Sequence, residues 1–333
     1  MRVYWSLTYI LAALITLACW ITFEIYWRAQ EYVPSVMDNF DLWSQHRIRA
    51  VKSAPPLRFV LLGASRIQYG VSPAAFRSET EKLGLAVDPI MLAVNGHYPL
   101  AALRDLSEDA RFVGIVLVGI DSRGMNRKVW EMQEKFVHSF RNDWSPSRNV
   151  HRHILTGLQE FAIAARPDFA VVTIVKRLLD GNGAPHKDYV NFSSDRSGAT
   201  DYQRQSGNLS AIIAARENSL RESYRQNPPP APEIWLSKVS EVAHWVEAIN
   251  SRGGKVIFYR EPVSGIHLEL DEENYPRPQY WDMLSMIMPA TMIDFRDYSE
   301  LMIDTPDTSH IDMHDIDRHT RALVRILHAK KIL

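Results

Sequence analysis

The sequence predicts an α/β fold: a doubly wound parallel sheet of the flavodoxin-like, three-layer kind, preceded by one transmembrane helix. Two observations lead to this prediction. Short apolar segments alternate with longer segments of helical periodicity, which is typical of parallel strands covered by helices on both faces. In addition, an uncharged segment of about 20 residues lies near the N-terminus, and this is the length that a membrane span requires.

The composition excludes several classes of function. The chain has 333 residues, of which 46% are apolar, so a large core is possible and global disorder is excluded. The formal net charge of −1 lacks the basic footprint of a nucleic-acid-binding protein, so we expect no nucleic-acid partner. The one cysteine, Cys19, excludes a disulfide within the chain. We expect no cofactor.

Residues 1–28 are predicted to anchor the chain in a lipid bilayer. The segment from Val3 to Phe23 carries no charge, and as a helix it would rise about 30 Å, the thickness of a hydrocarbon core. Aromatic residues lie near both ends, as interfacial anchors do: Tyr4, Trp5, Trp20, Tyr26 and Trp27. The alternative is a cleaved signal peptide, but the apolar segment is too long for one and no small-residue cleavage site follows it.

Residues 29–56 are predicted to form a juxtamembrane stalk, and residues 57–333 the folded domain. Four segments read as buried parallel strands: Leu57–Leu62, Pro89–Val94, Phe112–Ile120 and Lys255–Tyr259. Helical patterns lie between and after them: one that begins at Ser72-Pro73, Pro99–Ala110, Glu233–Ile249 and one from Ile311 onwards. Residues from about 125 to 232 interrupt the alternation and are polar and helix-leaning. We expect them to be an insertion packed over the catalytic face.

Ser65 is the candidate nucleophile. It lies just past the carboxyl end of the first predicted strand, where open α/β sheets place their ligand sites. Gly63 and Ala64 keep the turn before it small, so the hydroxyl could face an open cleft. The alternative is a serine that caps the next helix.

His310 is the candidate base, and Asp307 is the acid that would orient it. A serine needs a base to remove its proton and an acid to hold that base. Asp307 precedes His310 by three residues, so one turn of backbone brings the carboxylate to the ring nitrogen that faces away from the serine.

These segments resemble the sequence blocks of the SGNH (GDSL-like) hydrolase superfamily. Its first block, a strand followed by Gly-x-Ser, is similar to Gly63-Ala64-Ser65, and its last, Asp-x-x-His, to Asp307-Thr308-Ser309-His310. The resemblance implies an SGNH-like domain in which Asn95-Gly96 supplies the loop whose glycine amide lines the oxyanion hole.

The third block departs from the family pattern. Where the family carries Gly-x-Asn, this chain has Gly119-Ile120-Asp121. An ionised Asp121 would repel a developing oxyanion instead of stabilising it. Either another donor serves, such as Asn95 or Asn126, or the activity differs from that of ordinary esterases.

Because one membrane span precedes the domain, the chain resembles the anchored proteins of bacterial surface-polymer acylation, as in alginate and cellulose O-acetylation or teichoic-acid D-alanylation. This resemblance implies an acyltransferase or esterase that works through an acyl-Ser65 intermediate. It also implies a surface polysaccharide and a multi-span membrane acyltransferase as partners, and a single-pass place in the inner membrane with the body in the periplasm or outside. A non-catalytic accessory protein of the same fold is the main alternative, and a lipid or carbohydrate esterase acting alone is a third.

Two further patterns have competing interpretations. A histidine- and aspartate-rich segment near the C-terminus suggests a metal site: His310, Asp312, His314, Asp315, Asp317 and His319. The glutamate of the zincin motif is replaced by Ile311, and such segments usually form a polar helix face, so we expect no metal. Arg66, next to the candidate nucleophile, could contact an anionic substrate or form a surface salt bridge.

The predicted topology can be tested with reporter fusions. Alkaline phosphatase fused to the C-terminus should be active and green fluorescent protein fused there should be dark, because only the former matures outside the cytoplasm. The opposite pair of results would place Ser65 in the cytoplasm.

Overall fold

The structure is a computed structural model that describes residues 2–52, 55–183, 185, 190–202 and 208–333. These residues form two compact units. The first unit combines Met1–Asp38 with Pro146–Ser194, and the second combines Asn39–Ser145 with Asp195–Leu333.

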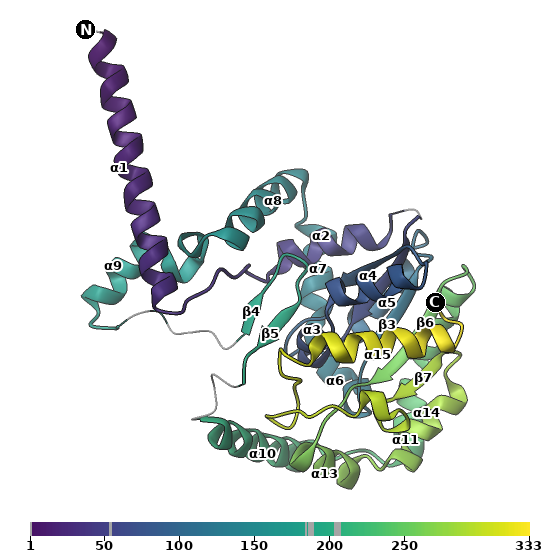
Figure 1. Cartoon of the computed structure of the whole chain (residues 1–333). Helices are drawn as coiled ribbons and strands as arrows, with labels where there is room; N and C mark the ends of the chain where they lie inside the picture. The colour runs from purple at the N-terminus through teal and green to yellow at the C-terminus, as the bar shows by residue number, and fades with distance from the viewer. Residues whose placement is uncertain (1, 53–54, 184, 186–189, 203–207) are drawn as a thin grey trace. The chain divides into compact units, whose positions relative to one another are not determined.

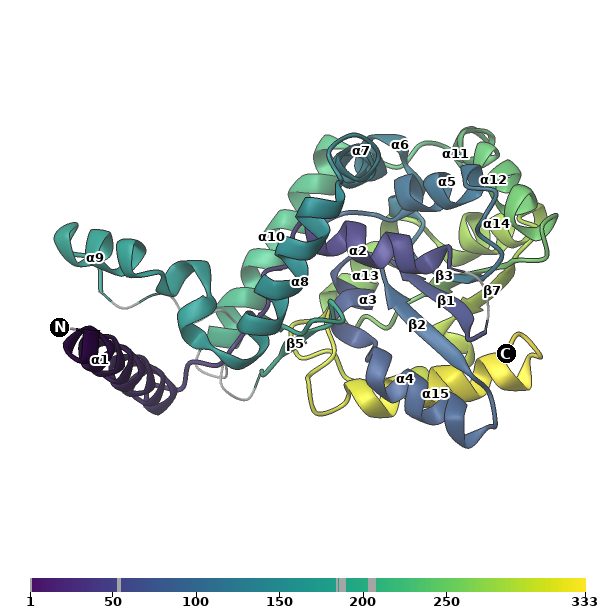
Figure 2. The same ribbon diagram turned by 90° about the horizontal axis from the view of Figure 1, so that it is seen from above.

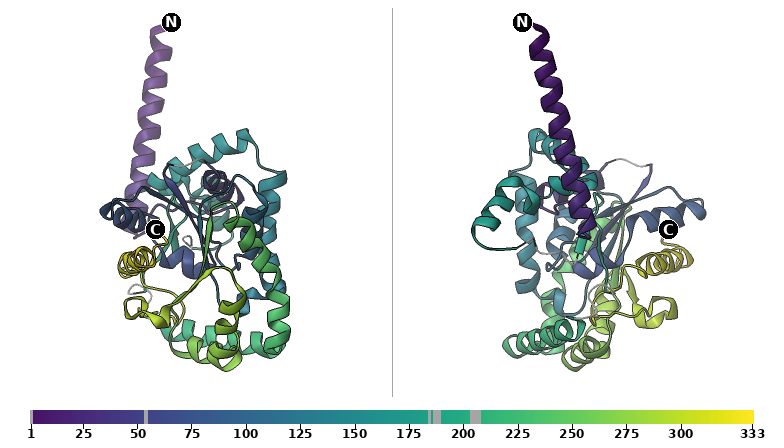
Figure 3. Two further views of the ribbon diagram at one scale, coloured as in Figure 1. Left: turned by 90° about the vertical axis from the view of Figure 1, so that its right-hand side faces the viewer. Right: turned by 60° about the vertical axis from the view of Figure 1, so that its left-hand side comes forward.

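The first unit contains the apolar helix that the sequence predicts. Its elements include α1 (Arg2–Ala29), α8 (Pro146–Phe161), α9 (Val171–Leu179), the short strand β4 (Val190–Phe192) and two 3-10 turns, Ile163–Ala165 and Pro167–Phe169. Helix α1 is continuous (Figure 3). Its most apolar stretch of 18 residues has a mean hydropathy of 1.9 and no buried residue, so the helix from Trp5 to Ala29 is long and apolar enough to cross a membrane.

The C-terminal end of α1 is held by side chains of the same unit. Phe23 and Trp27 pack with Phe169, and edge-to-face contacts join the three rings. The amide of Ala164 donates to Glu24 Oε1 at 2.9 Å, and Arg28 Nη2 donates to the carbonyl of Phe161 at 2.7 Å. The end of α1 is therefore continuous with the packed part of the first unit.

The second unit is built on a five-stranded parallel sheet in the order β2-β1-β3-β6-β7. Its strands are β1 (Leu57–Leu62), β2 (Val87–Met91), β3 (Ile115–Gly119), β6 (Lys255–Arg260) and β7 (Thr291–Asp294). This order is that of a doubly wound sheet of the flavodoxin type. The fold class predicted from the sequence, α/β with a parallel sheet and one apolar N-terminal helix, is confirmed.

Helices cover both faces of this sheet. The helices of the unit include α2 (Phe40–Ala50), α3 (Ser65–Gly70), α4 (Pro73–Lys82), α5 (Leu100–Glu108), α6 (Arg127–Trp130), α7 (Glu134–Asn142), α10 (Leu209–Gln226), α11 (Pro232–Val239), α12 (Glu241–Asn250), α13 (Gly265–Asn274), α14 (Trp281–Ile287) and α15 (Ile316–Ala329), and a short strand β5 spans Gly198–Thr200. Figure 2 shows α4 and α15 on one side of the sheet and α5 and α12 on the other.

Alternating side chains of the strands form two cores. In β1, Val60 and Leu62 belong to the core shared with α5 and α12, whereas Phe59 and Leu61 belong to the core shared with α4 and α15. A strand covered on both faces needs apolar residues at its buried positions, and this is why β1 is apolar throughout its buried part, from Phe59 to Leu62. The strand begins and ends where the sequence predicts.

The other elements differ at their ends. Strand β2 begins at Val87 and β3 at Ile115, and the C-terminal helix α15 begins at Ile316 because the residues before it form the loop that carries His310. Strand β7 was not predicted, since its four residues have too short an apolar pattern to be recognised.

The predicted stalk over residues 29–56 is wrong for its second half. Helix α2 belongs to the second unit, and Trp43, which is fully buried, donates from its indole nitrogen to the carbonyl of Leu92 at 3.0 Å. Buried Arg47 pairs with Asp105 at 2.5 Å. The charges in this segment suggested solvent exposure, but an ion partner far along the chain allows the arginine to be buried.

The residues of the predicted insertion, 125–232, are shared between the two units. Residues 146–194 belong to the unit that contains α1, whereas α6, α7 and α10 belong to the second unit. The sequence pattern is similar throughout, so it could not show which part packs with which unit.

Gly63 allows α3 to approach the end of β1. A Cβ atom at this position would lie 2.3 Å from Ile67 Cγ1 and 2.6 Å from Ile67 Cβ, both inside the core. At Gly70, the other end of α3, the nearest atom would be Ile311 Cδ1 at 3.4 Å, an ordinary contact.

We therefore predict that Gly63→Ala destabilises the protein and Gly70→Ala does not. Gly63→Ala should lower the free energy of unfolding by about 1–3 kcal/mol, the usual cost of overpacking. Thermal unfolding of the full chain in detergent, followed by circular dichroism, measures both variants. Equal melting temperatures would show that Ile67 can move aside.

Candidate active site

The candidate site lies at the carboxyl edge of the sheet, where parallel strands place the residues that follow them. Ser65 follows β1 after Gly63 and Ala64, Asp121 follows β3, and Glu261 follows β6 directly. Ser65 is the first residue of α3, and the capping position before it is Ala64, which makes no side-chain cap. The alternative role of Ser65 as a helix cap is therefore not what the structure has.

The structure brings Ser65, His310 and Asp307 into one chain of hydrogen bonds. Ser65 Oγ lies 2.7 Å from His310 Nε2, although 245 positions separate the two residues. His310 Nδ1 lies 2.8 Å from Asp307 Oδ2. An ionised carboxylate can only accept a hydrogen bond, so His310 Nδ1 must carry the hydrogen and donate it to Asp307. Nε2 then has a free lone pair that can accept the proton of Ser65.

The turn from Asp307 to His310 is closed by its own backbone. Asp307 Oδ1 accepts the amides of Ser309 at 3.0 Å and of His310 at 2.7 Å. Thr308, between them, has φ +69°, a left-handed conformation that a β-branched residue rarely adopts. The backbone is thus bent so that one carboxylate oxygen holds the turn and the other holds the ring.

Two residues that sequence analysis did not identify also hold Asp307. Tyr202 donates its hydroxyl to Asp307 Oδ2 at 2.7 Å, and Arg216 Nη2 donates to the same oxygen at 2.7 Å. Arg216 lies on α10, so the second-unit part of the predicted insertion contributes directly to the site. The carboxylate of Asp307 is fully buried and compensated by a cation.

Burial lowers the pKa of His310 below its ordinary value, against the raising effect of Asp307, and the positive charges of Arg216 and Arg66 lower it further. For Asp307, burial works to raise the pKa. The hydrogen bond and charge of His310, the charge of Arg216 and the hydrogen bond from Tyr202 outweigh it and hold the pKa below its ordinary value. At neutral pH the site therefore contains a neutral imidazole over an ionised carboxylate.

Arg66 pairs with Asp121 beside the candidate nucleophile. Its Nη1 lies 3.3 Å from Asp121 Oδ2, and the two side chains are only 12% and 4% exposed. Arg66 Nε donates to Ser309 Oγ at 3.2 Å, and Nη2 contacts His267 Nε2. The alternative of a surface salt bridge at Arg66 is wrong, because its ion pair with Asp121 is buried within the site.

Asp121 is surrounded by donors. Tyr98 donates its hydroxyl to Oδ2 at 3.0 Å, and the amide of Gly124 donates to Oδ1 at 2.8 Å. Burial works to raise the pKa of Asp121, but the charges of Arg66 and Arg123, among other effects, lower it overall. The carboxylate is thus ionised and its charge is directed toward Arg66.

A cavity of about 650 Å³ opens in front of Ser65 within the second unit. Arg66, Arg123 and Arg216 line it together with the buried Glu261, and α10 adds Ile212 and Ser219. Burial raises the pKa of Glu261 to about 7. The cavity therefore offers charged and hydroxyl groups as well as an apolar wall.

Of the residues predicted to form the oxyanion hole, Gly96 lines the cavity, whereas Asn95 and Asn126 do not. Gly96 lines the cavity and has φ +71°, which glycine adopts without strain. Asn95 is exposed, and its backbone amide donates to Gln68 Oε1 at 2.8 Å. Asn126 caps α6, where its side chain accepts from the amide of Lys128. Neither asparagine is among the residues that line the cavity.

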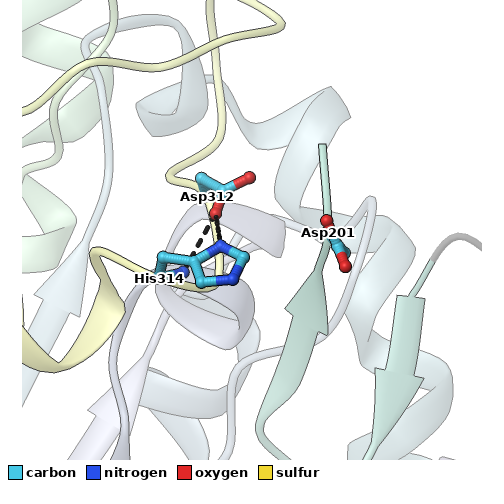
Figure 4. A group of neighbouring side chains, drawn as sticks. All are labelled: Asp201, Asp312 and His314. Carbon is cyan, nitrogen blue, oxygen red and sulfur yellow. Dashed lines mark hydrogen bonds and ion pairs between the residues drawn. The ribbon is translucent and has the colours of Figure 1, made fainter. Parts of the chain in front are cut away.

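One group among the described residues brings metal-ligating atoms close together: Asp201, Asp312 and His314, whose ligand atoms lie within 4.8 Å of one another. Dashed lines in Figure 4 join Asp312 and His314, and none reaches Asp201. The hydrogen bond to Asp312 raises the pKa of His314. Asp312 Oδ2 also accepts the amide of Tyr202 at 2.9 Å.

Several residues of the site carried no recognisable signal in the sequence. Tyr202, Arg216 and His267 stand in ordinary polar segments, and only the fold brings them to the triad. Glu261 could have been found, since it directly follows a predicted strand, where site residues gather in parallel sheets.

No protein-family model and no curated protein matches this sequence. The geometry of the site therefore carries the functional argument.

We predict that Arg216→Gln raises the pKa of His310, because it removes a positive charge that disfavours the imidazolium. In the natural protein the ring should titrate below its ordinary pKa of 6.5. Nuclear magnetic resonance of histidine-labelled protein measures this, with His310→Gln to assign the signal. Arg216→Lys keeps the charge and should titrate near the natural value, as should Arg221→Gln, which alters an exposed pair on the same helix. An unchanged titration in Arg216→Gln would show that Arg216 does not act on the ring.

Proposed function

We propose that this chain is a membrane-anchored acyltransferase or esterase of the SGNH type, which acts on a cell-surface polysaccharide through a Ser65–His310–Asp307 triad. The observation that carries the proposal is the 2.7 Å contact between Ser65 Oγ and His310 Nε2, with Asp307 on the other ring nitrogen. A neutral histidine between a serine hydroxyl and a buried carboxylate is the arrangement that activates a serine for attack.

The proposed reaction has two steps. Ser65 Oγ attacks the acyl carbonyl carbon while its proton passes to His310 Nε2, and Asp307 stabilises the imidazolium that forms. The tetrahedral intermediate collapses to acyl-Ser65, and the leaving group takes the proton from His310. A sugar hydroxyl then attacks the acyl carbon in the transferase reaction, or water does so in the esterase reaction, and His310 takes the proton of the attacking group. The bond between the acyl carbon and Ser65 Oγ breaks, and His310 returns the proton to Ser65.

The developing oxyanion needs donors other than the family asparagine. We assign this role to backbone amides of Ser65 and Gly96. The first amides of a helix have no partner within it, so the amide of Ser65 at the start of α3 is available to donate. Gly96 lines the same cavity as Ser65.

The alternative, a non-catalytic accessory protein of the same fold, is favoured by Asp121 at the third-block position. Its charge would oppose the oxyanion if it faced the reacting group. However, Asp121 accepts from Arg66 and Tyr98, so its charge is compensated locally. This pairing supports the catalytic proposal over the accessory one.

The substrate and the location are proposed from several features together. The cavity is much larger than an acetyl group, and its arginine, tyrosine and serine side chains suit a hydroxyl-rich substrate such as a sugar. Helix α1 is suited to tether the second unit to the membrane surface, where a multi-span acyltransferase could supply acyl groups from the periplasmic side. Tethering would raise the effective concentration of the site at such a donor.

We predict that Ser65→Ala abolishes reaction with serine-directed reagents. A fluorophosphonate probe should label the natural protein at Ser65, and His310→Ala should lose labelling nearly completely, because triad members act as one unit. Turnover of p-nitrophenyl acetate, if present, should fall by several orders of magnitude in both variants.

Intact-mass spectrometry with peptide mapping locates the label, and circular dichroism verifies the fold. Ser237→Ala, on the exposed surface of α11, serves as the matched control and should react as the natural protein does. Equal labelling of Ser65→Ala and the natural protein would exclude Ser65 as the nucleophile. A folded natural protein that the probe never labels would favour the accessory role.

A further inference from the structure

Helix α8 has its polar and apolar faces reversed relative to an ordinary surface helix. Val150, Ile154, Leu158 and Phe161 follow one another along a single face and are between 55% and 76% exposed. Arg152, Thr156 and Gln159 lie on the opposite face and are buried. A helix that packs against a core normally buries its apolar face and exposes its polar one.

Hydrogen bonds hold the polar face of α8 inward. Arg152 Nη2 donates to Gln159 Oε1 at 2.8 Å and its Nε donates to Thr156 Oγ1 at 2.9 Å. Gln159 Oε1 also accepts the amide of Met37 at 3.1 Å, and Gln159 Nε2 donates to the carbonyl of Ala165 at 3.1 Å. Because these bonds fix the inward face, the apolar residues are directed outward.

Helix α9 repeats the same feature on a smaller scale. No residue of α9 is buried, and its exposed apolar side chains gather on one arc of the helix: Val171, Val172, Val175, Leu178 and Leu179. Thr173, Lys176 and Arg177 occupy the remaining positions apart from Ile174. Ile174 packs onto the cluster of Tyr32, Ile163 and Phe169.

Both helices are joined to the end of α1. Phe161, the last residue of α8, accepts a hydrogen bond from Arg28 at its backbone carbonyl. Ile174 of α9 and Trp27 of α1 pack against the same cluster of Tyr32, Ile163 and Phe169. Figure 1 shows α9 beside the C-terminal end of α1. If α1 spans the bilayer, its end lies at the membrane surface, and α8 and α9 are held at the same level.

We propose that α8 and α9 form a second membrane contact, in which their exposed apolar faces lie in the lipid interface around the base of α1. The occupant is the lipid bilayer, because the apolar faces are continuous with a helix that is itself suited to lipid. Lys176 and Arg177 would face anionic headgroups beside the apolar arc, as in other interfacial helices. This contact would restrain the first unit against rotation about a single span.

The inference rests on the proposed anchoring by α1, and the native cysteine makes the two separable. Cys19, the only cysteine of the chain, lies within α1 and is exposed. A fluorophore on Cys19 of the natural full-length protein therefore reports insertion of α1. In a Cys19→Ser background, Ile154→Cys reports the apolar face of α8 and Leu179→Cys that of α9. Glu160→Cys is the matched control, because Glu160 is exposed on α8 but lies outside its apolar face.

Each labelled full-length protein is reconstituted into vesicles of phosphatidylethanolamine and phosphatidylglycerol that contain a lipid with a nitroxide quencher high on its acyl chain. We expect the labels at Cys19, Ile154→Cys and Leu179→Cys to lose most of their fluorescence, and the label at Glu160→Cys to retain it. Adding Leu158→Asp and Val175→Asp should restore the fluorescence of the α8 and α9 labels and leave the Cys19 label quenched.

The other outcomes overturn the proposal in distinguishable ways. Quenching at Cys19 alone would leave the anchor intact and exclude a lipid contact of α8 and α9. If the same cysteines, left unlabelled, react with a water-soluble thiol reagent in vesicles but are protected from it in native membranes, these faces would be assigned to a membrane protein partner. An unquenched Cys19 label would overturn the anchoring itself.

Discussion

The buried carboxylate of Asp307 is the group on which the rest of the site depends. One oxygen closes the turn that carries His310, and the other holds the imidazole, Tyr202 and Arg216. An ion buried this deeply would be costly without these partners, so the donors around it are required for the fold as well as for any chemistry. The same bonds keep Nε2 of the ring directed at Ser65.

A second buried ion pair has a comparable role on the other side of the nucleophile. Arg66 neutralises Asp121 and reaches Ser309 and His267. The two clusters meet at Ser309, whose amide binds Asp307 and whose hydroxyl binds Arg66. The residues that follow β1 and β3 are in this way linked to the loop that precedes α15.

The two units present different surfaces to their surroundings. The second unit buries apolar side chains on both faces of its sheet and opens a cavity that charged side chains help to line. The first unit exposes apolar side chains on α1, α8 and α9 and buries hydrogen-bonded polar groups behind α8. Such a division suits a protein that meets lipid with one part and a soluble or polymeric substrate with the other.

The sequence by itself determined the features that depend on local pattern: the α/β class, the limits of β1, the apolar N-terminal helix, Ser65 as a residue at a strand end, and Asp307 with His310 as a pair. The contact between Ser65 and His310, which lie 245 positions apart, was decided by the fold. Strand alternation, span length and a three-residue acid–base spacing are all visible within short windows. Only the tertiary structure decided that Tyr202 and Arg216 hold Asp307, that Arg66 pairs with Asp121, and that α2 packs into the second unit. These contacts join residues far apart in the chain, and burial of a charge depends on a partner that no local window contains.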